Sequence, residues 1–235
     1  MKILVINPNT SRPMTNQIRV ALEAIKRADT DLTVTCPEKG PETIESAYDE
    51  AYAIPPTLAL VKKANQDGFD AVILACFSDP GLDAAKEIST IPVIGIEEAT
   101  LHIAAMLGAK FSIMTPRKQR IPSKVEHVHL RGLSHFLASV RSLDLTVAET
   151  EADPGKTKQR LIEVSKIAVE EDGAEVIIMG CAGMAGYAQE IEDTLNIKVL
   201  DPSAVALKTA EAIADLGLSH SKVGLLATPP EKLFK

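Results

Sequence analysis

The chain has 235 residues, 46% of them hydrophobic, and a formal net charge of −7 at pH 7. This length suffices for one large α/β domain or for two small ones that share an interface. The negative charge disfavours nucleic acid as a partner, because a phosphate backbone would be repelled. No apolar run approaches the roughly 20 residues of a membrane helix, and the N-terminus does not resemble a secretory signal, so we expect a cytoplasmic protein.

Short apolar segments alternate with longer segments of helical periodicity. The predicted strands are Lys2–Ile6, Leu32–Cys36, Ala71–Ala75, Pro92–Ile94, Phe111–Met114, Leu145–Ala148, Glu175–Met179, Lys198–Leu200 and Val223–Leu226. The clearest predicted helices are Met14–Lys26, Glu45–Gln66, Glu97–Leu107, Lys156–Glu171 and Ser203–Leu216. The alternation predicts βαβ units in mostly parallel sheets, whose ligands bind beyond the carboxyl ends of the strands.

An internal repeat divides the chain into two similar halves. The segment Asp67–Cys76 aligns with Asp172–Cys181, and Lys2–Pro8 aligns with Lys110–Pro116. In each copy of the first pair, an apolar strand ends in a cysteine and is followed by a turn that contains glycine. We therefore predict an α/β fold of two pseudo-symmetric lobes. Each lobe is a mostly parallel sheet flanked by helices, with the active site in the cleft between them.

The repeat also predicts the extent of each lobe. The first lobe comprises residues 1–108 and the second comprises residues 109–217. A fainter echo of the first strand near the C-terminus indicates that residues 218–235 return to the first lobe.

The three cysteines of the chain are Cys36, Cys76 and Cys181. This odd and sparse set is a poor disulfide framework, so the thiols should be free. Cys36 lies inside a strand-like segment and is interpreted as a buried core residue. Cys76 and Cys181 occupy matched positions of the repeat, which disfavours the same interpretation for them. If the lobes face each other, both thiols point into one cleft.

Two thiols on opposite faces of one carbon can invert its configuration. One removes a proton as a thiolate, and the other donates a proton as a thiol. Asp79 and Pro80 follow Cys76 as a good helix N-cap and first helical residue. We therefore expect a helix start that lowers the pKa of Cys76. The small-residue turn after Cys181 could expose backbone N–H groups to an enolate oxygen.

The blocks around these residues resemble the aspartate/glutamate racemase superfamily and, within it, the hydantoin and allantoin racemases. The resemblance is carried by the segments ILVINPNTS, ACFSDPGLDAAKE, PVIGIEEA and GCAGMAG. It covers most of the chain and weakens in residues 116–150. It implies racemisation of 5-substituted hydantoins or of allantoin, without a metal or pyridoxal phosphate. It also implies a small cyclic ureide as substrate and a homo-oligomer.

The resemblance assigns roles by position. Cys76 and Cys181 are implied to be the paired acid and base. The implied substrate-binding residues lie in the loops that follow the strands: Asn7, Asn9, Thr10, Ser78, Thr115, Ala182 and Gly183. The segment Ile44–Tyr48 is expected to border the pocket.

One departure separates this chain from the amino-acid racemases of the superfamily. Those enzymes typically carry Asn-Thr and Thr-His after their cysteines, where this chain has Phe77-Ser78 and Ala182-Gly183. The missing polar side chains favour a neutral ring over a zwitterionic amino acid. An aspartate/glutamate-type racemase and a maleate-type isomerase stay open as alternatives. A small-molecule-binding protein is the alternative outside the enzymes.

Overall fold

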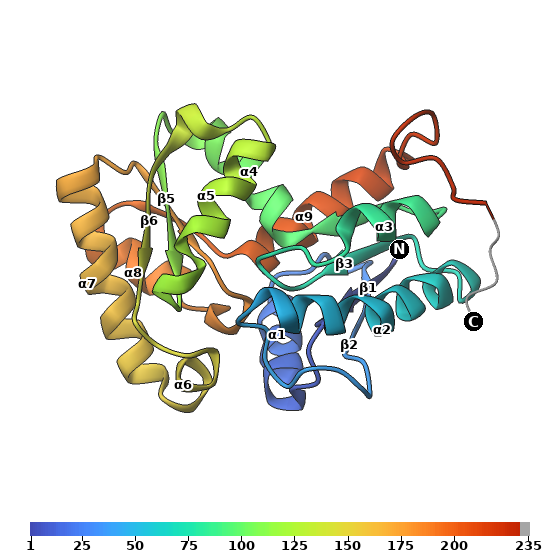
Figure 1. The fold of residues 1–235 in the computed structure, drawn as a ribbon, viewed down its shortest axis with the longest axis horizontal. Helices are drawn as coiled ribbons and strands as arrows, with labels where there is room; N and C mark the ends of the chain where they lie inside the picture. The colour runs from blue at the N-terminus through green and yellow to red at the C-terminus, as the bar shows by residue number, and fades with distance from the viewer. Residues whose placement is uncertain (231–235) are drawn as a thin grey trace.

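A computed structural model describes residues 1–230, which form two four-stranded sheets with every pair of neighbouring strands parallel (Figure 1). The strand orders are β2-β1-β3-β4 and β6-β5-β7-β8. The strands of the first sheet are β1 (Lys2–Ile6), β2 (Asp31–Thr35), β3 (Ala71–Leu74) and β4 (Val93–Gly95). Those of the second sheet are β5 (Phe111–Thr115), β6 (Leu137–Ser142), β7 (Val176–Met179) and β8 (Lys198–Leu200). The predicted fold of two lobes with parallel sheets is confirmed.

Helices join the strands and cover the sheets. They are α1 (Arg12–Glu23), α2 (Ala47–Gln66), α3 (Leu82–Ile88), α4 (Ile96–Leu107), α5 (Ile121–Leu130), α6 (Val147–Ala152), α7 (Pro154–Asp172), α8 (Ala188–Leu195) and α9 (Pro202–Asp215). The five predicted helices are present with ends shifted by a few residues. Local chemistry fixes several starts: Ser46 and Asp49 form a capping box at α2, and Asp201 caps α9.

Two predicted strands are wrong. Residues 145–148 lie in a connection and in the first turn of α6, and the strand of this region is β6. β6 is an edge strand whose only buried residue is Val140, so it lacks the apolar run of a covered strand. The apolar Leu145, which lies in the connection between β6 and α6, is buried without belonging to a strand. Residues 223–226 form no strand, and Val223 and Leu225 are exposed to 89% and 83%.

The two sheets have the same strand order, so the sequence repeat corresponds to a repeat of the fold. β3 and β7 hold the same place in their sheets, each between two parallel neighbours. Both are completely buried, as their continuous apolar sequences predict. The residues that follow these two strands therefore stand at equivalent points of the two lobes.

α9 and the segment that follows it contact elements of the first lobe. α9 packs against β3, β4 and α4. Beyond it, the backbone N–H of Val93 donates to His220 Nε2 at 2.7 Å, and Lys222 Nζ donates to the carbonyls of Lys86 and Glu87. The C-terminal segment therefore contacts the first lobe through His220 and Lys222, whereas Val223 and Leu225 are exposed. Residues 231–235 of the predicted return lie outside the described residues.

A shared apolar core connects the lobes beneath the cleft. One cluster of buried side chains contains Ile3 and Ile73 of the first sheet, Ile113 and Ile178 of the second, and Leu207 of α9. Each sheet also has a smaller cluster of its own on its other face. Because close-packed cores resist deformation, this shared cluster fixes the position of one sheet relative to the other.

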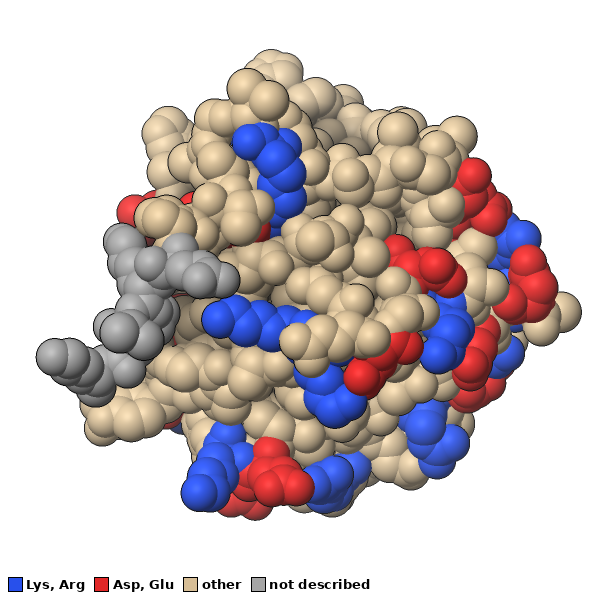
Figure 2. All heavy atoms as spheres, turned by 90° about the vertical axis from the view of Figure 1, so that its right-hand side faces the viewer, with Lys and Arg blue, Asp and Glu red and all other residues tan. Residues whose placement is uncertain are grey.

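The surface carries charges of both signs. On the face at the first-lobe end of the molecule, basic and acidic side chains are interspersed rather than gathered by sign (Figure 2). Within residues 1–230, no helix combines the length and the apolar character needed to cross a bilayer.

Candidate active site

The carboxyl ends of both sheets open into one cavity between the lobes. In the first sheet, β1 lies between β2 and β3, so the connections after β1 and β3 diverge and leave a crevice. The second sheet repeats this arrangement at β5 and β7. The cavity encloses about 570 Å³, including the space at its mouth, and residues of both lobes line it.

Most of the predicted site residues line this cavity, namely Asn7, Asn9, Cys76, Ser78, Thr115, Cys181 and Ala182. Thr10 does not line it, because its backbone N–H and its hydroxyl both donate to the carbonyl of Pro41. Gly183 does not line the cavity either, and its carbonyl accepts a hydrogen bond from Gln17 Nε2 at 3.1 Å. From the segment that was expected to border the pocket, Ile44 and Glu45 line the cavity.

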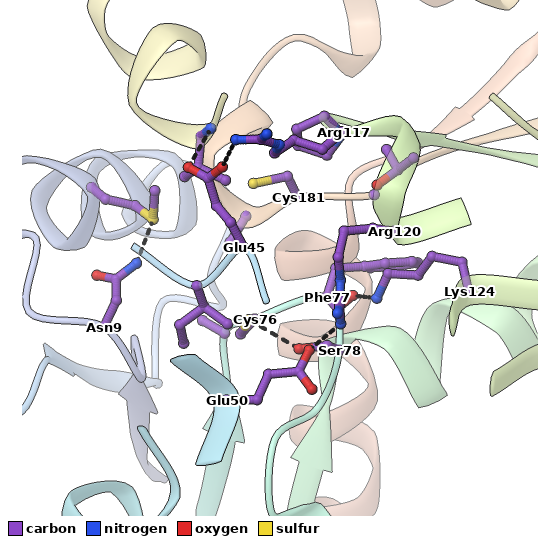
Figure 3. A pocket seen from close by; sticks show the side chains of 18 of the residues that line it. Asn9, Glu45, Glu50, Cys76, Phe77, Ser78, Arg117, Arg120, Lys124 and Cys181 are labelled. Carbon is purple, nitrogen blue, oxygen red and sulfur yellow. Dashed lines mark hydrogen bonds and ion pairs between the residues drawn. The ribbon is translucent and has the colours of Figure 1, made fainter. Parts of the chain in front are cut away.

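The two cysteines of the repeat approach the cavity from opposite sides (Figure 3). Cys76 follows β3 and Cys181 follows β7, and both are free and partly buried. The Sγ atom of Cys76 lies 3.5 Å from the hydroxyl of Ser78. The third cysteine, Cys36, is free and buried, with 4% exposure, as its interpretation as a core residue requires.

Burial decides the acidity of both thiols. It raises the pKa of Cys76 to about 12, although the hydrogen bond with Ser78 and the charge of Lys124 act in the opposite direction. It raises the pKa of Cys181 to about 11, although the backbone N–H of Gly183 partly offsets it. Both groups are therefore neutral thiols at neutral pH. The expectation of a lowered pKa at Cys76 is wrong.

The expected lowering of the Cys76 pKa is wrong because Asp79 does not cap the helix that follows Cys76. The helix that follows, α3, begins only at Leu82 and has Gly81 rather than Asp79 as its N-cap. Asp79 has a positive φ of 44°, and its carboxylate accepts hydrogen bonds from the N–H groups of Glu97 and Glu98 at 3.0 and 2.7 Å. It therefore caps α4, which is distant in sequence, and ties the Cys76 loop to that helix.

Four charged residues that were not predicted also line the cavity: Glu50 from the first lobe, and Arg117, Arg120 and Lys124 from the second (Figure 3). Glu45, from the segment expected to border the pocket, lies among them. Arg117 Nη1 lies 2.8 Å from Glu45 Oε2, and Arg120 pairs with Glu50. The basic run just after β5 is the sequence signal that could have indicated them.

Glu45 makes a further contact across the cleft. Its other carboxylate oxygen accepts a hydrogen bond from the backbone N–H of Val147 at 3.1 Å. The carboxylate therefore holds both Arg117 and the start of α6 against the first lobe at the mouth of the cavity.

Asn7 lines the cavity and carries a buried acceptor without a partner among residues 1–230. Its side chain is 1% exposed, and Nδ2 donates to Asn9 Oδ1 at 2.7 Å and to Thr15 Oγ1 at 3.0 Å. Asn9 Oδ1 also accepts from the N–H of Ser11, so these partners fix the orientation of the Asn7 amide. Within the described part of the chain, Asn7 Oδ1 has no hydrogen-bond partner. An orphaned buried acceptor costs about 1–3 kcal/mol, which a ligand N–H would relieve.

Comparison with known proteins identifies the family. Residues 3–210 match the family described as Asp/Glu/Hydantoin racemase. The chain belongs to this family. It is 41% identical to a hydantoin racemase of Pseudomonas sp. (strain NS671), over 100% of this chain and 94% of that protein. It is 37% identical to a hydantoin racemase of Paenarthrobacter aurescens, over the full length of both chains.

A solved structure agrees with this assignment. The allantoin racemase from Klebsiella pneumoniae superposes with a TM-score of 0.97 at 37% identity, covering 100% of this chain and 96% of that one. The present chain is therefore a racemase, an enzyme of the isomerase class. The predicted resemblance to the hydantoin and allantoin racemases is confirmed.

In this racemase, Gly180 allows close packing directly before Cys181. A Cβ atom at Gly180 would lie 2.6 Å from the carbonyl oxygen of Met114, to which the Gly180 N–H donates at 2.8 Å. We expect Gly180→Ala to lower the free energy of unfolding by about 2–4 kcal/mol and to displace Cys181, since a backbone atom has to move. Urea unfolding and a racemisation assay measure the two effects.

Gly155→Ala is the matched control. Gly155 lies in the first turn of α7, and its added Cβ would meet only Asp153 Oδ1 at 3.5 Å. Alanine there should be neutral or stabilising by up to about 1 kcal/mol. Equal stabilities of the two variants would show that the β5–β7 contact adjusts without cost.

Proposed function

We propose that this racemase inverts C5 of 5-substituted hydantoins or of allantoin, with Cys76 and Cys181 as the paired base and acid. The observation that carries the proposal is that both thiols stand at equivalent strand ends of the two lobes and line one cavity. The names of the relatives, hydantoin racemase and allantoin racemase, support the substrate class.

The proposed reaction is a pair of proton transfers. The thiolate of one cysteine takes the proton from C5, and the electron pair of that C–H bond passes into an enolate that includes the adjacent carbonyl. The thiol of the other cysteine then gives its proton to the opposite face of C5, which restores the carbonyl and leaves a thiolate. The ring is neither oxidised nor reduced, so the balance needs no cofactor. The backbone N–H of Ala182 is proposed to bind the enolate oxygen.

The charges of the cavity support a neutral ring rather than a free amino acid. Among the described residues that line it, each cation already pairs with a carboxylate: Arg117 with Glu45, Arg120 with Glu50, and Lys124 with Glu97. A substrate carboxylate would have to compete with one of these pairs. A ring N–H, in contrast, can donate to the orphaned Oδ1 of Asn7.

Polarimetry tests the proposed function. The purified, chelator-treated protein is incubated with one enantiomer of allantoin, with L-5-benzylhydantoin and with L-aspartate. We expect the rotation of a ring compound to decay to zero faster than its spontaneous rate, while that of aspartate stays constant. Decay with aspartate alone would assign the protein to the amino-acid racemases. Constant rotation with all three would refute the proposed substrates. Cys36→Ala should behave as the wild type.

A further inference from the structure

Lys124 connects the second lobe to the cysteine loop of the first. It lies on α5, and its side chain, 4% exposed, lines the cavity. Its Nζ atom donates to the backbone carbonyl of Phe77, the residue directly after Cys76. The same atom lies 3.0 Å from Glu97 Oε1 and 5.0 Å from the centre of the Phe77 ring. Two contacts with Phe77 therefore hold the cation against the Cys76 loop, and the third joins it to Glu97 of α4.

Glu97 makes this connection rigid. It lies in the first turn of α4, is 0% exposed, and receives a contact from His127 Nδ1 at 2.7 Å through its second carboxylate oxygen. Its backbone N–H donates to Asp79, which belongs to the Cys76 loop. A buried charge without its partner is very unfavourable, so Lys124 and Glu97 hold each other in place. The Lys124–Glu97 pair therefore joins the Cys76 loop, α4 and α5.

The charge of Lys124 acts on both thiols. It lowers the pKa of Cys76 and of Cys181, against the larger effect of burial. Carboxylates act in the other sense: Glu50 raises the pKa of Cys76, and Glu151 and Glu45 raise that of Cys181. The charged groups that line the cavity are Glu45, Glu50, Arg117, Arg120 and Lys124. Among the largest effects on the two pKa values, Lys124 is the cation common to both cysteines.

We propose that Lys124 is a positioning residue that holds the Cys76 loop across the cleft and supplies the positive charge that stabilises the thiolate form of the pair. Glu97 sets how much of that charge reaches the thiols, because it forms an ion pair with Lys124 and does not itself line the cavity. The proposal rests on the proposed roles of Cys76 and Cys181 and adds the group that makes their deprotonation possible in a buried site.

Two substitutions of opposite expected effect test the proposal. Lys124→Met removes the charge and keeps the length of the side chain, whereas Glu97→Gln keeps the shape and removes the neutralising partner. The rate of alkylation by iodoacetamide at pH 8 is measured at each cysteine by mass spectrometry. We expect Lys124→Met to slow alkylation of Cys76 and Cys181 about tenfold, because a rise of about one unit in the thiol pKa lowers the reactive thiolate fraction tenfold. Glu97→Gln should accelerate it about threefold or more, since the charge is less screened.

Lys86→Met is the matched control. Lys86 is also buried, and its Nζ atom lies 2.5 Å from Glu98 Oε2, but it does not line the cavity. Its loss breaks a buried ion pair next to Glu97, so the melting temperature should fall much as in Lys124→Met. Alkylation of the two cavity cysteines should keep its wild-type rate. The buried Cys36 serves as an internal reference for unfolding.

A shift of the alkylation rate in the same direction in Lys124→Met and Glu97→Gln would overturn the proposal, as would equal rates in Lys124→Met and Lys86→Met. If Lys124→Met does not fold, an unchanged or slower alkylation in Glu97→Gln is sufficient to refute it. The readout needs no substrate. Wild-type protein without racemase activity but with the expected order of alkylation would therefore refute the proposed function and leave the role of Lys124 intact.

Discussion

Replacing Cys76 or Cys181 by serine is expected to abolish racemisation, with a loss of about 10²–10⁴-fold or more in kcat, because each variant lacks one of the two proposed acid–base groups. A serine hydroxyl is a much weaker acid than a thiol and cannot form the required anion. Both cysteines are only partly buried, so the substitution should change the free energy of unfolding by about 1 kcal/mol or less. Polarimetry measures the activity, and urea unfolding verifies the fold.

The same two variants also test whether the thiols face opposite sides of the substrate. Each keeps one cysteine, which can still remove the proton from the one enantiomer it reaches and return a deuteron to the same face in D₂O. Proton NMR of each pure enantiomer should show exchange from one enantiomer with Cys76→Ser and from the other with Cys181→Ser. Exchange from the same enantiomer in both would contradict opposed faces. Cys36→Ala is the control that should leave racemisation unchanged.

The second large effect is the dependence of the rate on pH. Burial raises the pKa of Cys76 to about 12 and that of Cys181 to about 11, so the thiolate is a small fraction at neutral pH. Below these values, the thiolate fraction grows tenfold for each pH unit. The partner cysteine stays protonated over the same range and can serve as the acid. We therefore expect kcat/KM to rise by close to tenfold per unit between about pH 7 and 9.5.

The measurement requires a correction for the spontaneous racemisation of the ring, which also accelerates with pH. The protein with both Cys76→Ser and Cys181→Ser provides the blank. A plateau or a maximum between about pH 7 and 8 would contradict the raised pKa values. It would show that one cysteine is already a thiolate at neutral pH, as the sequence analysis expected.

Raised pKa values suit the proposed chemistry. The proton at C5 is weakly acidic, and a thiolate of high pKa is the stronger base toward it, at the expense of a smaller population. Racemisation also runs equally well in both directions, since two enantiomers have the same free energy. The two thiols, with pKa values of about 12 and about 11, are similar enough to exchange the roles of acid and base.

Much of the fold is predictable because local patterns encode it. The strands Lys2–Ile6 and Lys198–Leu200 have the predicted bounds, and buried strands such as β3 are continuous apolar runs. Helix starts such as that of α9 carry their own caps. Where local chemistry is ambiguous the prediction fails: β6 is a half-buried edge strand without an apolar run, and the apolar segment 223–226 is mostly exposed and pairs with no strand.

By itself, the sequence determined the two-lobed α/β fold, the equivalence of β3 and β7, and the two cysteines that follow these strands. All of these depend on residues close together in the chain or on a visible repeat. Only the tertiary structure decided that Asp79 caps α4, that α9 lies on the first sheet, and that Lys124 reaches the Cys76 loop. It also decided the direction of the thiol pKa values. Exclusion of water and contacts between distant segments arise from packing, and no local pattern of residues encodes them.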